Sequence, residues 1–130
     1  MTQRSIDFVQ KRDFYRHRFA IPLPAIMRVS RLNDKVINQD KTTIVYVSNI
    51  SAGGLSFSSE LDIPIRKGDI RLQFILELAK QTFVVEGLLV RRTEYAGRNE
   101  IIYGVAFEID SALERELVVA INQISIQNRI

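Results

Sequence analysis

Residues 70–76 read IRLQFIL, and they decide the fold because an apolar side chain stands at every second position. A spacing of two places alternate side chains on one face of a β-strand. Pro64 and the sequence KGD at residues 67–69 mark a turn just before this stretch. We therefore expect a strand that buries one face in a core. The side chains expected on that face are Ile70, Leu72, Phe74 and Leu76.

Further strands are expected on both sides of this one, from β-branched and aromatic composition or from the same alternation. Pro22 and Pro24 favour extended backbone before them, so the first strand is expected to begin near Ala25. Residues 33–35 and 96–99 have turn composition, and the short loop 96–99 implies an antiparallel pair. The expected strands are residues 25–30, 42–47, 55–58, 70–76, 83–91 and 101–109.

The last segment changes to a helical period, and Ser111 is expected to cap this helix with Glu114 completing a capping box. Six short strands must close on themselves or cover their edges, which favours a barrel. The fold class we predict is mostly β: a small six-stranded antiparallel β-barrel with a C-terminal α-helix and an N-terminal basic arm. The arm is residues 1–19, and the barrel with its helix is residues 20–130. The apolar positions at helical spacing are Leu113, Leu117, Ala120, Ile121 and Ile124.

The composition fits one globular domain, since 46% of the 130 residues are hydrophobic and 25% are charged. The chain has no cysteine and a single histidine, His17, so we expect no disulfide, no metal site and no other cofactor. Neither an apolar run of membrane-spanning length nor a signal peptide is visible. We therefore expect a cytoplasmic protein without membrane insertion.

Positive charge is concentrated near the start of the chain. Residues 11–18 hold four basic side chains and one acidic one, which equals the formal net charge of +3 for the whole chain. Duplex DNA or RNA would require basic side chains spread over a groove-sized surface. The cluster suits a small anion instead, so no DNA or RNA partner is expected. A solvated basic arm is the simpler alternative.

Two motifs that lie far apart carry the candidate chemistry. Arg12 and Arg16 share one side in either a helix or a strand, and their guanidinium forks suit phosphate oxygens or the edge of guanine. The second motif is Asn49-x-Ser51-x-x-Gly54, a polar turn between two expected strands. Its amide and hydroxyl can pair with a base edge, while its glycines permit positive φ and close approach of a ligand. The simpler alternatives are a surface ion pair and a turn whose side chains bond their own backbone.

RxxxR followed by [D/N]xSxxG is the signature of the PilZ domain, and the chain resembles this family of cyclic di-GMP receptors over about residues 11–127. The resemblance implies that the first arginine holds a base, that the second binds phosphate, that Asn49 and Ser51 contact a guanine, and that the last glycine leaves room for it. Many members have aspartate in place of Asn49, which implies a lower affinity here. Some members carry arginine at the position of Lys11 and bind an intercalated pair of ligands, so the stoichiometry stays open. The implied site is Arg12, Arg16, Asn49, Ser51 and Gly54, with Lys11 and Gly53 as further candidates.

Our principal hypothesis is a cyclic di-GMP receptor whose arm becomes ordered on binding and which signals to an unidentified downstream protein in motility, adhesion or exopolysaccharide control. One alternative is a PilZ-like protein-interaction module that does not bind nucleotide. Another is a small barrel for single-stranded nucleic acid, although the aromatic residues fall mostly on expected core faces. An enzyme is not expected, because the carboxylates form no evident pair and Ser51 lacks a nearby base.

Overall fold

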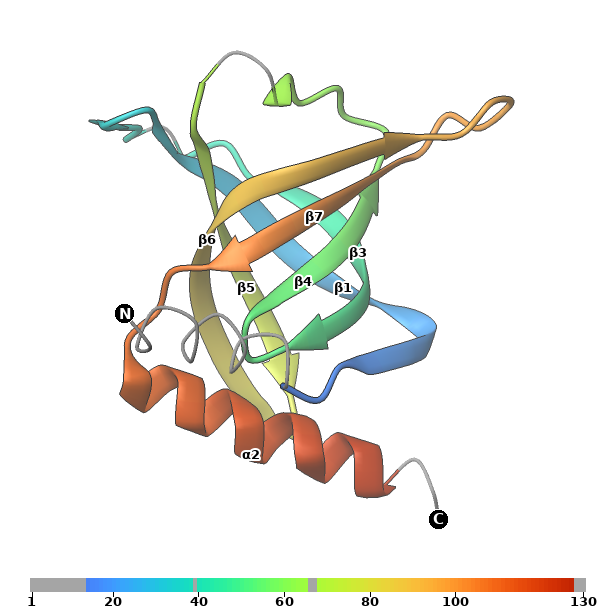
Figure 1. Cartoon of the computed structure of the whole chain (residues 1–130), viewed down its shortest axis with the longest axis vertical. Coiled ribbons are helices and arrows are strands. Elements are labelled where there is room, and N and C mark those ends of the chain that lie inside the picture. Colours follow the sequence, from blue (N-terminus) through green and yellow to red (C-terminus); the bar gives the residue numbers. More distant parts are fainter. Residues whose placement is uncertain (1–13, 39, 66–67, 128–130) are drawn as a thin grey trace, which may run out of the picture.

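The structure is a computed structural model of the chain, and it describes residues 14–38, 40–65 and 68–127. Within these ranges the fold is mostly β, as predicted: a closed six-stranded antiparallel barrel with one extra short strand and a C-terminal helix (Figure 1). The strands are β1 (His17–Leu32), β2 (Lys35–Val36), β3 (Thr43–Ser51), β4 (Gly54–Ser59), β5 (Ile70–Leu78), β6 (Gln81–Glu94) and β7 (Ile101–Phe107), and the helix is α2 (Ser111–Gln127).

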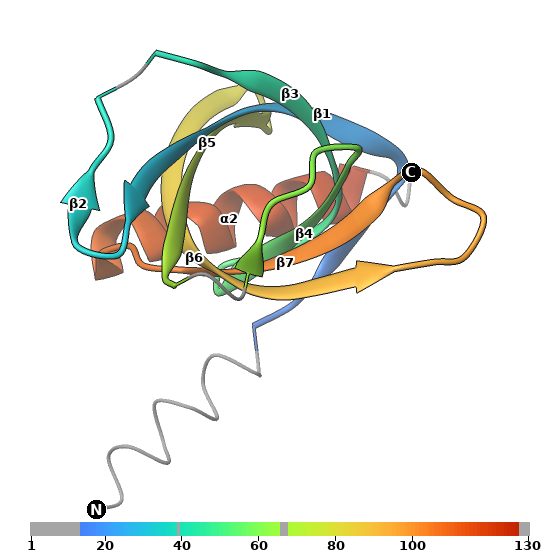
Figure 2. The ribbon, with the colours of Figure 1, turned by 90° about the horizontal axis from the view of Figure 1, so that it is seen from above.

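The long strand β1 closes the barrel because it pairs on both sides. The strand order is β2-β1-β3-β4-β7-β6-β5, and β1 also pairs with β5. Ile26 lies at the closure, opposite Ile44 of β3 and Ile75 of β5. Seen from above, the strands form a ring and α2 lies across its far end (Figure 2). Closure leaves β2 as the strand outside the ring.

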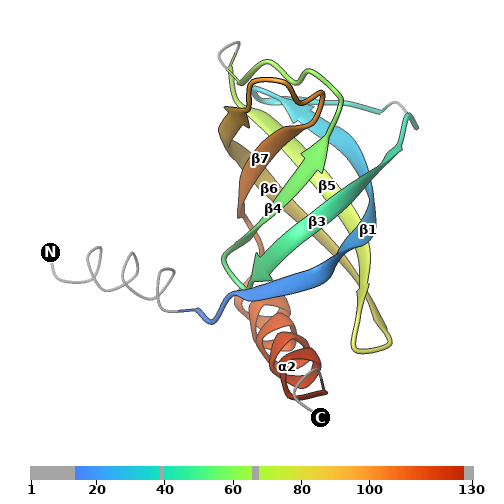
Figure 3. The same ribbon diagram turned by 90° about the vertical axis from the view of Figure 1, so that its right-hand side faces the viewer.

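The core fills the barrel, and the alternation in residues 70–76 is confirmed. All four of the predicted inward side chains in β5 are buried. Phe57 stacks on Tyr103 with ring centroids 5.0 Å apart and meets Phe74 edge-on at 5.4 Å. The helix α2 covers the lower end of the barrel (Figure 3) and buries Leu117, Ala120 and Ile121 there. Barrel and helix therefore share one core.

The first strand differs from the prediction, since β1 begins at His17 rather than near Ala25. Pro22 and Pro24 lie inside it. The register with β3 is irregular between Arg18 and Leu23, and pairing with β5 starts only at Ile26, so each proline has an unpaired side where a missing N–H costs little. The division into an arm of residues 1–19 and a barrel of residues 20–130 stays a prediction, because residues 1–13 lie outside the described part.

The start of α2 also differs from the prediction. Asp110, not Ser111, is the N-cap, because its Oδ1 accepts a hydrogen bond of 2.8 Å from the backbone N–H of Leu113. Glu114 then donates the first helical bond, to the carbonyl of Asp110, at 3.0 Å. A carboxylate also suits the positive end of the helix dipole, which favours aspartate at this position.

Candidate functional site

Five residues form a row across the sheet from β1 to β6, each directly opposite the next in the strand register. Arg18 pairs with Asn49, Asn49 with Ser56, Ser56 with Gly104, and Gly104 with Arg91. We call these five residues the polar row. The middle members Ser56 and Gly104 are small and buried, whereas Arg18 and Arg91 at the ends are exposed. The surface is therefore low over Ser56 and Gly104, which we call the floor, and a long cationic side chain stands at each end of the row.

A hollow of about 410 Å³ opens over this floor. The neighbours of the floor residues along the strands, such as Leu55 and Val105, are in the core, so Ser56 and Gly104 face outward. The volume lies within the range of small-molecule sites, roughly 300–1,000 Å³. Among the described residues that line the hollow there are three arginines, Arg16, Arg18 and Arg91, and no carboxylate. Its chemistry is that of an anion site.

Strand irregularities aim the side chains of the polar row. The register shifts between Val47 and Asn49 in β3 and between Leu89 and Arg91 in β6. Leu89 is buried, so strict alternation would also turn Arg91 into the core, but the extra residue at the bulge leaves Arg91 exposed. The same device acts next to Asn49. Bulges thus convert positions of the core face into positions of the site.

Arg16 brings together three of the predicted site residues. One guanidinium nitrogen, Nη1, donates to Oδ1 of Asn49, and Nη2 donates to Oγ of Ser51 at 3.4 Å. Ser51 is buried, and its Oγ also accepts from the backbone N–H of Gly53 at 3.1 Å. The serine is therefore held by its own turn and presents its oxygen to the arginine. Two motifs that are far apart in sequence meet at one place.

The charges around Arg16 repel one another. Burial lowers the pKa of Arg16 most, and the positive charges of Arg91 and Arg18 lower it further. Arginine stays protonated at neutral pH even so. An anion in the hollow would replace this repulsion with attraction.

The two glycines of the second motif act differently from the expectation. Neither Gly53 nor Gly54 has positive φ; among the described glycines, that conformation occurs at Gly68 and Gly97. A β-carbon on Gly54 would lie 2.2 Å from the carbonyl oxygen of Val105. Gly54 is therefore required for β4 to approach β7, a structural reason that holds without any ligand.

The remaining predicted residues are placed as follows. Arg12 and Lys11 lie outside the described residues. Phe14 packs partly against the core, and the Tyr15 hydroxyl accepts a bond of 3.0 Å from Ser125 of α2, so these aromatics anchor the chain beside the barrel. His17 is buried, with its ring edge-to-face on Phe19 at 4.9 Å.

Sequence reasoning missed four members of the site. Arg18 was assigned only to the basic cluster, and Ser56, Gly104 and Arg91 were assigned only to strands. One signal was available: an arginine at position 91, in phase with the buried side chains of β6, violates the alternation and so indicates a bulge. The pairing of Ser56 with Gly104 depends on tertiary structure and has no such signal.

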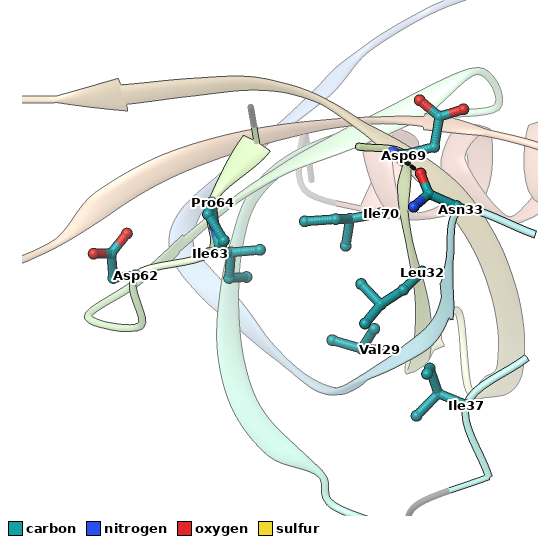
Figure 4. Close-up of a pocket in the computed structure, with 9 residues that line it drawn as sticks. All are labelled: Val29, Leu32, Asn33, Ile37, Asp62, Ile63, Pro64, Asp69 and Ile70. Atoms are coloured by element: carbon teal, nitrogen blue, oxygen red, sulfur yellow. Dashed lines mark hydrogen bonds between the residues drawn. The ribbon is translucent and has the colours of Figure 1, made fainter. Parts of the chain in front are cut away.

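A second pocket, of about 610 Å³, is apolar and lies elsewhere (Figure 4). It lies between β1 and the loop before β5, with Val29, Ile63 and Ile70 among its walls. The hydroxyl of buried Tyr103 holds that loop, since it donates to the carbonyl of Leu61 and accepts from the N–H of Ile63 at 2.9 Å. Of the predicted site residues that the structure describes, none lines this pocket.

Three acidic side chains of the described residues form ion pairs: Asp62, Glu94 and Glu108. Within the described ranges, no group of three or more His, Asp or Glu side chains is placed to hold a metal ion. Glu108 pairs with Arg71 at 2.6 Å, and this bond raises the pKa of Arg71.

No helix in the described part of the chain is both long and apolar enough to cross a bilayer.

The comparisons with known proteins agree with this geometry. The model of the PilZ domain family matches residues 10–123. The chain therefore belongs to the PilZ domain family. No curated protein sequence matches the chain.

Three solved structures have a similar fold. The inhibitor of motility MotI/DgrA of Bacillus subtilis has a TM-score of 0.64 and 15% identity, over 91% of this chain and 53% of that one. The PilZ domain of YcgR from Escherichia coli, solved with c-di-GMP, has a TM-score of 0.59 and 18% identity, over 90% of this chain and 93% of that one. PlzA of Borreliella burgdorferi, in complex with c-di-GMP, has a TM-score of 0.55 and 13% identity, over 98% of this chain and 58% of that one. The chain thus spans about half the length of the motility inhibitor.

Proposed function

We propose that this protein is a receptor for cyclic di-GMP and that the ligand binds in the hollow over the polar row. The observation that carries the proposal is the meeting of Arg16 with Asn49 and Ser51, at the edge of a cavity that three arginines line. Membership of the PilZ family supports the choice of ligand. Two of the similar structures are complexes with c-di-GMP, which also favours it.

The chemistry of the ligand matches the groups in the hollow. Cyclic di-GMP carries two phosphates and two guanines. Arg16 binds a phosphate through its planar fork, and Asn49 and Ser51 offer an amide and a hydroxyl to a guanine edge. Arg12 supplies the base contact that the family motif implies. Because Arg16 already bonds Asn49 and Ser51, binding exchanges these bonds for bonds to the ligand.

In this proposal, binding is passed on through the segment that carries the arginines. The part of the arm that precedes β1 becomes ordered against the barrel when Arg12 and Arg16 hold the ligand, whereas residues 17–19 of the arm already belong to β1. Tyr15 supports such a route, because it stands next to Arg16 in the chain and bonds Ser125 near the end of α2. The new surface would be read by a partner protein in the cytoplasm, in control of motility, adhesion or exopolysaccharide.

A second candidate is a protein-interaction module that does not bind nucleotide. Four exposed apolar side chains on β3, β1, β5 and β6 favour it, since they lie opposite one another in register. We call them the apolar row. Its members and their exposed fractions are Ile44 (60%), Ile26 (43%), Ile75 (37%) and Val84 (48%).

Isothermal titration of the whole chain with cyclic di-GMP tests the proposal, with GTP as the control ligand. Saturable binding at micromolar or tighter affinity that is absent with GTP would support the receptor. The matched control variant is Arg98→Ala, which removes one arginine from the exposed loop between β6 and β7. Absence of heat at several temperatures, with no shift of the melting curve, would reject the receptor and favour the interaction module.

A further inference from the structure

We propose that Arg91 of β6 is a second anion-binding position in the hollow, on the opposite side from Arg16, and that it holds a phosphate of the ligand. The proposal rests on the proposed function of the hollow and goes beyond the two sequence motifs, neither of which includes Arg91.

The floor of the hollow holds the Arg91 guanidinium in place. A β-carbon on Gly104 would lie only 3.2 Å from Cβ and 3.3 Å from Cζ and Nε of Arg91, so the side chain lies over the glycine along much of its length. Nη2 also donates to Oγ of Ser56 at 3.2 Å. An arginine carries five N–H donors, so this single bond leaves donors free for a ligand. The side chain is thus positioned in advance and still able to bind.

The neighbouring arginines differ from Arg91 in their partners. Arg92, the next residue, bonds Asp62 and pairs with Glu94 at 3.2 Å, and Arg71 pairs with Glu108. Arg91 forms no ion pair with any residue in the described ranges. A guanidinium that is fixed by a glycine and a serine, without a carboxylate, has its full charge available for an anion.

The position of Arg91 also suits a ligand with two anionic groups. It lies at one end of the polar row, while Arg16 binds Asn49 on the other side of the floor. The Arg91 guanidinium reaches Ser56, which lies opposite the Asn49 that Arg16 bonds, so the two cations offer donors over neighbouring positions of the row. A cyclic dinucleotide has phosphates on opposite sides of its ring, so it can engage both.

The first test is the affinity of the whole chain for cyclic di-GMP in four forms: wild type, Arg91→Ala, Arg91→Lys and Arg98→Ala. We expect Arg91→Ala to weaken binding by about tenfold or more, because a charge-assisted bond is lost. Arg91→Lys should recover only part of this loss, since lysine keeps the charge without the fork. Arg98→Ala should bind like wild type. Equal affinity of wild type and Arg91→Ala would overturn the proposal and leave the receptor function intact.

The second test uses inorganic pyrophosphate, so that it does not depend on cyclic di-GMP. In ¹H–¹⁵N spectra of the whole chain, pyrophosphate should shift the Gly104 amide and the Arg91 Nε–H in wild type. In Arg91→Ala the shift at Gly104 should be absent. If wild type fails to bind cyclic di-GMP but shows this shift, the receptor function is wrong and the anion position stands. If it does neither, both are wrong.

Discussion

Two rows of side chains cross the outside of this barrel, and they differ in how regular the strands beneath them are. The apolar row lies where the pairing of β3, β1, β5 and β6 continues without a shift through Ile44, Ile26, Ile75 and Val84. The polar row lies beside register shifts in β1, β3 and β6. Regular pairing presents side chains as an even surface, whereas bulges and small residues produce a hollow. The barrel therefore gains a binding site where its pairing is imperfect.

The largest effect is expected for Gly54→Ala, which tests whether this glycine of the hollow is needed for β4 to pair with β7. The added β-carbon would meet the carbonyl oxygen of Val105 at 2.2 Å, so β4 and β7 must separate. We expect the free energy of unfolding to fall by about 3 kcal/mol or more, measured by urea denaturation. A variant that keeps wild-type stability and loses only ligand affinity would mean that Gly54 serves the ligand instead.

Next in size is Arg16→Ala, which should separate binding from stability. The side chain bonds Asn49 and Ser51 at the surface of the barrel and lies outside the core. We expect binding of cyclic di-GMP to weaken by about 2–3 kcal/mol, because a charged hydrogen-bonding group is lost, while the thermal midpoint changes little. Titration calorimetry and a melting curve measure the two effects. A large drop of the thermal midpoint without ligand would show that Arg16 is structural.

A smaller effect is expected for Asn49→Asp, which changes the charge of the polar row by one unit. The carboxylate would still accept from Arg16 and could accept two guanine donors with full charge. We expect tighter binding of cyclic di-GMP, by about 1 kcal/mol, and a larger gain at high salt because salt screens the repulsion between the carboxylate and the ligand phosphates. Titrations at two ionic strengths measure it. Weaker binding at both would mean that the carboxylate repels the ligand phosphates more strongly than it attracts the guanine.

The smallest effect is expected in the apolar row. The double variant Ile44→Ser/Val84→Ser changes two side chains that are about half exposed. We expect the affinity for cyclic di-GMP to stay the same and the free energy of unfolding to change by less than about 1 kcal/mol. Calorimetry and denaturation measure both. A clear loss of ligand affinity would contradict the separation of the two rows.

The parts of the fold that follow from local alternation were predictable. The inward face of β5 and the buried face of α2 came out as expected, because each depends on a period within one element. The start of β1 differed from the prediction. Pro22 and Pro24 suggest a strand boundary, but the irregular register between Arg18 and Leu23 accommodates prolines within the strand. The cap at Asp110 was missed because Ser111 followed by Glu114 also fits the capping pattern.

The site residues that belong to a sequence motif were predictable, whereas those that meet only through the pairing of two strands were not. Arg16, Asn49 and Ser51 belong to the two signatures, and the structure brings them together. Arg91 and Gly104 meet only because β6 and β7 pair with a one-residue shift near Leu89. A local pattern contains no information on which residue lies opposite which across two strands. An arginine in phase with the buried side chains of β6 was the one local sign.

The bonded side chains of the hollow are far apart along the chain: Arg16 is separated from Asn49 by 33 positions and Arg91 from Ser56 by 35. No short fragment contains both partners, so the hollow forms only as the chain completes its long-range pairing. A ligand of the hollow must then bind only folded molecules. It should stabilise them, and so raise the melting temperature, with the logarithm of the ratio of its concentration to its dissociation constant. Once the number of ligands per folded molecule is known, the stoichiometry of a titration would consequently give the fraction of molecules in a preparation that have folded.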